Sequence, residues 1–523
     1  MKRKNLLITF VATTLLTAAP ATAQTPSKTW NPNVSGGKYR NPVIDADYSD
    51  PDVCRVGNDY YMTSSSFACF PGLQILHSTD LVNWELIGAA LTNDYPVLPE
   101  YKDTDIDWKR RIQHGNYVWA PSIRYHDGWF YIYCGDPDQG LFMTKTKDPR
   151  GQWSPVEWVM KGKGLIDCCP LWDDDGKAYL SFGCAGSRAG IKSVLFMAPL
   201  SSDGSHVTGP ARIIYDGHED QPTIEGTKLY KRNGYYYIMS PAGGVKYGWQ
   251  VILRSKDPFG PYEEYVGMAQ GKSKINGPHQ GAWVDTPDNE DWFIHFQDKG
   301  VAGRIIHMQP VHWQDDWPVM GNNGEPIFRH QGIKDNGTKD GKPTYANFFR
   351  RDDFDGLELA LDWQWSGGYV SPKWYFCDAA HSLLRLYSAE CEQDGYIPNQ
   401  LLQKIPDVAF TATARVRFMP NSHPEMKEAE HAGMIVFGRQ SFRLEVAVTG
   451  EWCYLRLQMT DKQIGQFYTS QDGQQWTPYG KPFQAVEGVW TGAQIGLYCT
   501  RDHRIFNDAG WMDVDYFELQ MDN

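Results

Sequence analysis

Three carboxylic acids, Asp50, Asp167 and Glu225, occupy the same position in three repeated stretches of the chain. Each stands eight residues before an Asn or Asp of a predicted turn, and an aromatic strand follows the turn. Acids that meet at one site can divide acid–base work, because burial and nearby negative charge keep one protonated while another stays ionised. Hydrolysis of a glycosidic bond requires such a pair.

The same spacing occurs five times and predicts the fold. Trp119 and His279 hold the equivalent position in two further stretches, His279 with a spacing of nine residues. The five positions lie 48 to 69 residues apart. Repeated β-hairpins at this period are typical of a β-propeller, whose innermost strands surround a central channel. We therefore predict a five-bladed β-propeller with Asp50, Asp167 and Glu225 gathered around its channel.

Each of these residues also has a structural interpretation. A single Asp or Glu could cap a strand or accept backbone N–H bonds, and Asp52 is an alternative to Asp50 that departs from the eight-residue spacing. His279 could bind a water or a cation in the channel, or be a core histidine. Arg304 follows the fifth hairpin and could contact sugar hydroxyls or a carboxylate, or form a surface ion pair. Three acids at matched positions favour the functional interpretation.

The N-terminus has the features of a secretory signal peptide. Residues 1–23 contain basic residues at positions 2–4, an apolar run over 6–16 and a small-residue cleavage site at 21–23. We expect an exported protein located in the periplasm. The apolar run is too short to span a membrane. The net charge of −13 argues against nucleic acid and anionic membrane surfaces as partners.

The rest of the chain is predicted to be all-β, with two domains. Residues 24–325 form the predicted propeller, and helical periodicity is nearly absent from residue 40 to residue 325. Residues 326–345 are rich in Gly, Asn, Lys and Asp and predict a linker. Residues 346–523 contain alternating strands, such as 410–418 and 453–459, and predict a β-sandwich. None of the ten cysteines shows zinc-ligand spacing.

The chain resembles glycoside hydrolase family 43. The resemblance rests on phrases that follow one another over the predicted propeller: Asn41-Pro42, Asp50-Pro51, Trp119-Ala120-Pro121, Asp167, Ile224-Glu225-Gly226 and His279-Gln280-Gly281. It implies that Asp50 is the general base, Glu225 the general acid, and Asp167 the residue that orients the acid and tunes its pKa. The implied reaction inverts the configuration at the anomeric carbon. By the same resemblance, the sugar pocket is lined by Phe67, Phe70, Trp119, Ser240 and Trp249. Ser49, and Cys168-Cys169-Pro170 after Asp167, depart from the family's usual phrases.

The resemblance also implies a substrate and a second domain. The C-terminal segment looks like the concanavalin A-like sandwich behind one branch of family 43 xylosidases and arabinofuranosidases. We expect an exo-acting enzyme that releases terminal α-L-arabinofuranose from hemicellulose oligosaccharides, such as xyloglucan or arabinoxylan side chains. A β-D-xylosidase and a non-catalytic sugar-binding propeller are the alternatives. The chemistry needs no cofactor, although several family members hold calcium in the channel near the position of His279.

Overall fold

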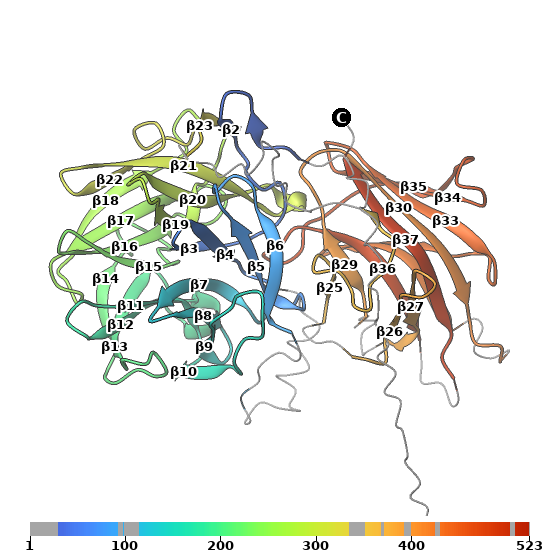
Figure 1. Cartoon of the computed structure of the whole chain (residues 1–523), viewed down its shortest axis with the longest axis horizontal. Helices are drawn as coiled ribbons and strands as arrows, with labels where there is room; N and C mark the ends of the chain where they lie inside the picture. Colours follow the sequence, from blue (N-terminus) through green and yellow to red (C-terminus); the bar gives the residue numbers. More distant parts are fainter. Residues whose placement is uncertain are drawn as a thin grey trace, which may run out of the picture.

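The computed structural model describes residues 30–92, 98, 115–333, 351–367, 371–391, 399–423, 429–502 and 508–521. Figure 1 shows two β-rich parts side by side, an N-terminal part up to residue 333 and a C-terminal part from residue 351. Within these ranges the helical structure is limited to α2 (Gly186–Ala189) and the 3-10 turn η1 (Gly300–Ala302). The all-β prediction is confirmed. No helix in the described ranges is long and apolar enough to cross a membrane.

Five four-stranded antiparallel sheets form most of the N-terminal part, and each holds four strands that are consecutive in the chain. Their strands are β3 (Asp52–Val56), β4 (Asp59–Thr63), β5 (Gly72–Ser78), β6 (Glu85–Leu91); β7 (Trp119–His126), β8 (Trp129–Asp136), β9 (Gly140–Thr146), β10 (Glu157–Lys161); β11 (Leu165–Trp172), β12 (Ala178–Cys184), β13 (Val194–Leu200), β14 (Arg212–Asp216); β15 (Lys228–Arg232), β16 (Tyr235–Ala242), β17 (Trp249–Ser255), β18 (Glu263–Met268); and β19 (His279–Asp285), β20 (Asp291–Asp298), β21 (Arg304–Gln314), β22 (Trp317–Met320). The first two strands of every sheet pair as one of the five predicted hairpins.

The first strands of the five sheets lie close together. β3 contacts β7, β7 contacts β11 and β11 contacts β15, while β19 contacts both β16 and β3. The last sheet therefore lies beside the first. This arrangement brings the chain positions of the repeated spacing to one region of the molecule.

Two larger sheets form the C-terminal sandwich. The first has the order β26-β27-β37-β30-β33-β34-β35 with β24 beside β37, and the second has the order β25-β29-β36-β31-β32 with β28 beside β36. Their strands are β24 (Arg351–Asp352), β25 (Gln364–Trp365), β26 (Tyr375–Asp378), β27 (Leu383–Tyr387), β28 (Ala389–Glu390), β29 (Leu401–Lys404), β30 (Phe410–Met419), β31 (Glu430–Phe437), β32 (Phe442–Glu445), β33 (Trp452–Met459), β34 (Ile464–Ser470), β35 (Thr477–Gln484), β36 (Gln494–Arg501) and β37 (Trp511–Met521). Alternate residues of the long strands are buried, as the sequence pattern predicted.

Part of the predicted linker is a strand. β23 (Arg329–Gln331) pairs with β2 (Lys38–Arg40), which pairs with β1 (Asn33–Val34). The remainder of the linker from residue 334, like the predicted signal peptide, lies outside the described residues.

The two parts share one hydrophobic core. Buried side chains of the first and fifth sheets, such as Met62 and Ile294, belong to the same cluster as Trp365 and Leu497 of the sandwich. Phe70 and Trp365 also exchange backbone hydrogen bonds, with the Phe70 N–H donating to the Trp365 carbonyl at 2.8 Å. The sandwich is therefore fixed against the sheets that carry the predicted site.

Candidate active site

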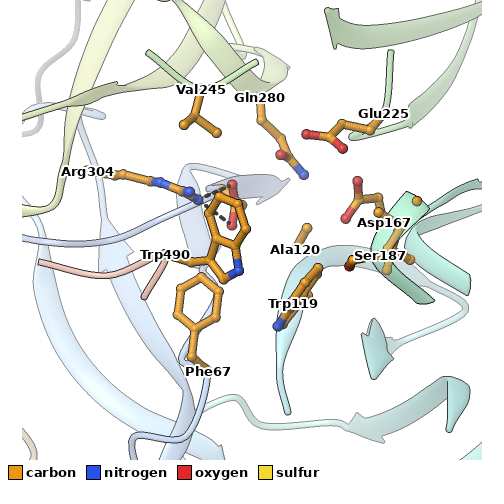
Figure 2. A pocket seen from close by; sticks show the side chains of 14 residues that line it. Phe67, Trp119, Ala120, Asp167, Ser187, Glu225, Val245, Gln280, Arg304 and Trp490 are labelled. Carbon is orange, nitrogen blue, oxygen red and sulfur yellow. Dashed lines mark hydrogen bonds and ion pairs between the residues drawn. The ribbon is translucent and has the colours of Figure 1, made fainter. Parts of the chain in front are cut away.

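The three predicted acids line one cavity of about 240 Å³. Figure 2 shows Asp167 and Glu225 facing the cavity, with Arg304 reaching into it from another side. The cavity is lined by Asp50, Phe67, Trp119, Ala120, Ile166, Asp167, Ala185, Gly186, Ser187, Glu225, Val245, Gln280, Arg304 and Trp490. The sequence spacing thus predicted correctly that Asp50, Asp167 and Glu225 come together.

Each acid lies at or near the start of the first strand of its sheet. Asp50 precedes β3, Asp167 lies in β11 at a register shift, and Glu225 precedes β15. Asp50 and Asp167 have φ values of 55° and 60°. Non-glycine residues adopt such values infrequently, and strained backbone of this kind concentrates at functional sites. The positive φ values of these two acids therefore agree with a functional role at the cavity that they line.

The Asp50 carboxylate is held by a hydroxyl and a cation. The Ser65 hydroxyl donates to Asp50 Oδ2 at 2.5 Å, and the Ala120 N–H donates to the Ser65 oxygen at 2.7 Å. Arg304 Nη1 lies 3.1 Å and 3.3 Å from the two oxygens of Asp50. Both side chains of this ion pair are nearly fully buried. A charge-assisted contact in such surroundings fixes the carboxylate and keeps a positive charge against it.

Asp167 is coupled to the backbone beside Glu225. The Gly226 N–H donates to Asp167 Oδ2 at 2.7 Å, and the Thr227 hydroxyl donates to the Asp167 carbonyl at 2.7 Å. Asp167 thereby fixes the segment that carries the Glu225 side chain.

Burial and mutual repulsion favour protons on two of the acids. Burial, followed by the charge of Asp50, raises the pKa of Asp167 to about 7. Burial, followed by the charges of Asp167 and Asp50, raises the pKa of Glu225 to about 8, while Arg304 opposes the shift. Both acids therefore keep a proton to a higher pH than ordinary carboxyl groups do, and for Glu225 this is the property that a general acid needs at neutral pH.

Aromatic rings from both domains form one wall of the cavity. Phe67, between β4 and β5, and Trp119, at the start of β7, both line it, and the Trp119 Nε1–H donates to the Gly115 carbonyl at 2.8 Å. Trp490 lies between β35 and β36 of the sandwich and meets Trp119 edge to face, with ring centroids 6.2 Å apart. The residue is 48% exposed, so part of the ring remains available to a ligand. The sandwich therefore contributes directly to the cavity.

Three residues predicted to line the pocket do not line this cavity. Phe70 packs in a hydrophobic cluster and pairs with the sandwich through its backbone. Ser240 is fully buried within β16. Trp249 donates from Nε1 to Gln221 Oε1 at 2.7 Å. The expectation that they line the sugar pocket is therefore not met at this cavity, because Phe70 and Ser240 are buried away from it and the Trp249 indole is hydrogen-bonded to Gln221.

The structure adds residues that the spacing did not identify. Gln280 follows His279, has a φ of 38° and points into the cavity between Glu225 and Arg304 (Figure 2). Ser65 lies in a run of serines after β4 and contacts Asp50. The phrase that contains Gln280 was visible in the sequence, whereas nothing distinguished Ser65 from its neighbours.

Asp52, the alternative to Asp50, is a structural residue. Its side chain is fully buried, and its Oδ2 accepts from Arg124 Nη1 at 2.6 Å and from the Ile123 N–H at 2.8 Å. It is absent from the cavity lining, so the choice of Asp50 agrees with the geometry.

His279 is a buried, neutral side chain. Burial, followed by the charge of Arg304, lowers its pKa to about 3. Neither ring nitrogen has a hydrogen-bond partner among the described residues, which fits a water as a partner. Calcium prefers six to eight oxygen ligands, and the described residues contain no group of three His, Cys, Asp or Glu side chains that could hold a metal ion. The His, Cys, Asp and Glu side chains of the described residues do not form a calcium site by themselves, and calcium near His279 stays a prediction.

The raised pKa of Glu225 predicts how stability depends on pH. The folded protein binds this proton more tightly than the unfolded chain, whose glutamates titrate near 4.5. The free energy of unfolding therefore decreases through this group as the pH rises from about 4.5 to about 8. In Glu225→Gln the group is gone, so Tm should fall less between about pH 5 and about pH 9 than in the wild type. Thermal unfolding across this pH range measures the change in Tm, with Glu219→Gln at an exposed position as control. Parallel plots of Tm against pH for Glu225→Gln and the wild type would contradict the raised pKa of Glu225.

Comparison with known proteins agrees with the architecture. Glycosyl hydrolases family 43 matches residues 39–318, and the β-xylosidase C-terminal concanavalin A-like domain matches residues 351–452 and 440–520. A protein of Xylanibacter ruminicola, named as a proposed β-xylosidase, is 33% identical over 92% of this chain and 90% of its own length. A non-reducing end α-L-arabinofuranosidase of Bacteroides ovatus is 31% identical over 80% of this chain and 78% of its own.

Solved structures share the fold over nearly the whole chain. A Bacteroides ovatus family 43 structure, whose name includes xyloglucan, aligns with a TM-score of 0.75 and 25% identity over 92% of this chain and 100% of its own. A family 43 protein of Bacillus licheniformis aligns with a TM-score of 0.76 and 24% identity over 93% of this chain and 100% of its own. With both domains matched in order, this chain belongs to glycoside hydrolase family 43.

Proposed function

We propose that this family 43 member is an exo-acting, inverting glycosidase that releases terminal non-reducing α-L-arabinofuranosyl residues from hemicellulose side chains of xyloglucan or arabinoxylan. The observation that carries the proposal is the division of roles inside one cavity. Asp50 is paired with Arg304, whereas Glu225 has a raised pKa and no cation bonded to its carboxylate among the contacts described. One carboxylate is thus prepared to accept a proton and one carboxylic acid to give one.

The mechanism that fits this arrangement is a single displacement. Asp50 accepts a proton from a water molecule, and the water oxygen forms a bond to the anomeric carbon. Glu225 gives its proton to the glycosidic oxygen as the bond between that oxygen and the anomeric carbon breaks. Attack from the face opposite the leaving group inverts the anomeric centre. Asp167 holds the Glu225 segment through the Gly226 N–H and raises the pKa of Glu225 by its charge.

The walls of the cavity support release of one terminal sugar. Phe67, Trp119 and Trp490 present aromatic surface against which the apolar face of a sugar ring can stack. The small volume of about 240 Å³ favours a single residue at the acids over a continuous polymer. Arg304, Gln280 and Ser187 provide polar groups for sugar hydroxyls.

Two terminal sugars are candidates for the residue that is released. The name of the Bacteroides ovatus relative supports arabinofuranose, and the xyloglucan in the name of the matching structure supports a side-chain substrate. β-D-xylose is the second candidate, because the Xylanibacter ruminicola protein and a β-xylosidase of Formosa agariphila, 29% identical over 96% of this chain and 93% of its own length, carry names for that activity.

The proposal includes a closed propeller and export. The contact of β19 with β3 supports closure of the five sheets into a five-bladed ring around the acids. The basic, apolar and small-residue pattern of residues 1–23 supports export to the periplasm, where oligosaccharides derived from plant cell walls can reach the cavity.

Initial rates on aryl α-L-arabinofuranoside and aryl β-D-xyloside, measured side by side, test the substrate. We expect the arabinoside to be hydrolysed faster. The rate of Asp50→Asn should be at least about 100-fold lower on either substrate, because the attacking water then has no general base. The rate of Glu225→Gln should fall more on natural oligosaccharides than on aryl glycosides, because the aryl leaving group needs less protonation. Faster hydrolysis of the xyloside would assign β-D-xylose, not α-L-arabinofuranose, as the sugar released. Wild-type protein that is folded, binds sugar and hydrolyses neither would favour a sugar-binding propeller.

The pH profile tests the roles of the acids. Activity requires protonated Glu225, so the alkaline limb of kcat/KM should lie near pH 8, the pKa of that group. Asp167→Asn removes a negative charge that raises this pKa, and the alkaline limb of the variant should move to lower pH. An alkaline limb that stays in place would show that Glu225 is not the group that titrates, or that Asp167 does not act on it.

A further inference from the structure

One half-buried carboxylate outside the cavity connects the two domains next to it. We propose that Asp47 is a positioning residue that holds two walls of the site in register, namely the strand that begins at Arg304 and the sandwich loop that carries Trp490. The consequences for catalysis rest on the function proposed above, whereas the structural role does not depend on it.

Each oxygen of Asp47 accepts from a different domain. The Arg304 N–H donates to Oδ1 at 2.9 Å, and the Gly492 N–H donates to Oδ2 at 2.8 Å. Arg304 is the cation that contacts Asp50, and Gly492 lies two residues after Trp490. The carboxylate of Asp47 therefore connects the partner of the proposed base with the aromatic wall from the sandwich.

The backbones on either side of this carboxylate approach so closely that only glycine fits at two positions. A Cβ on Gly303, which has a φ of 76°, would lie 2.3 Å from Asp47 Cγ. A Cβ on Gly492 would lie 2.6 Å from the Gly303 nitrogen. The next residue of the loop, Ala493, donates its N–H to the Val301 carbonyl at 2.7 Å. The two backbones thus approach closely, and Asp47 links them where they meet.

The charge of Asp47 is held by backbone donors and two nearby cations. Burial raises its pKa, while the two N–H bonds and the charges of Lys404 and Arg304 oppose the shift. Lys404 belongs to the sandwich and donates to Gln74 Oε1 at 2.8 Å. An ionised carboxylate with two acceptor oxygens satisfies both N–H groups, which a neutral amide of the same shape cannot do.

Asp47→Asn is the direct test, because the shape is kept and one acceptor oxygen becomes an NH2 donor facing an N–H. We expect faster amide hydrogen exchange in residues 300–304 or 487–493, measured by mass spectrometry, than in the wild type. Asp45→Asn is the matched control. Asp45 is a buried carboxylate at the same domain boundary and accepts from the Asp407 N–H at 3.3 Å, but it contacts neither Arg304 nor Gly492 among the hydrogen bonds described. Unchanged exchange in both segments, or equal increases in the two variants, would overturn the proposal.

Kinetics separate positioning from general loss of structure. Asp47→Asn should raise KM for an arabinosyl or xylosyl oligosaccharide by about tenfold, which corresponds to the free energy of one charged hydrogen bond. Displaced Arg304 should also move the alkaline limb of kcat/KM to higher pH, because its charge lowers the pKa of Glu225. In a Trp490→Ala background the effect on KM should shrink, since the wall that Asp47 positions is already lost.

The outcomes distinguish this inference from the proposed function. If the wild type hydrolyses and binds none of the sugars, the proposed function fails, and hydrogen exchange still decides the role of Asp47. If the wild type is active, an equal KM effect of Asp47→Asn with and without Trp490 would show that Asp47 does not act through the sandwich loop.

Discussion

Repulsion among three carboxyl groups in one small, buried cavity is the constraint on which the site depends. Ionising Asp167 or Glu225 there is costly, because burial raises the pKa of both groups and the charge of Asp50 raises both pKa values further. Arg304 relieves part of this repulsion beside Asp50. The remaining repulsion favours a proton on Glu225, and that proton is what the proposed reaction uses. The same repulsion that makes negative charge costly in the cavity therefore separates the proposed proton donor, Glu225, from the proposed base, Asp50.

The fold makes this arrangement possible by bringing each acid from a different sheet. No single strand or turn could hold three acids so close, because neighbouring residues of a strand point to opposite faces. Positive φ values at Asp50 and Asp167 add local strain, which the paired strands and the shared core of the two domains must offset. The sandwich contributes to the site as well as to stability, because Trp490 lines the cavity and its loop is tied to Asp47.

The part of the site that follows the repeated spacing was predictable from the sequence. Asp50, Asp167 and Glu225 hold equivalent positions at three of the five hairpins, and equivalent positions in repeated sheets meet in space. Trp490 and Asp47 were not predictable in this way, since contacts between a sheet repeat and a separate sandwich leave no period in the sequence. Phe70, Ser240 and Trp249 were expected in the pocket through family resemblance alone. Strand pairing, burial and a hydrogen bond to Gln221 direct their side chains elsewhere.

The central claim is that Asp50 activates water while Glu225 protonates the leaving oxygen, and the stereochemistry of the product tests it most directly. Proton NMR recorded from the first turnovers identifies the anomer that is released before it equilibrates in water. We predict that the first sugar formed has the anomeric configuration opposite to that of the substrate, as direct attack by water requires. Release of the sugar with its original configuration would mean that a carboxylate, Asp50 foremost, forms a covalent intermediate, and would contradict the account.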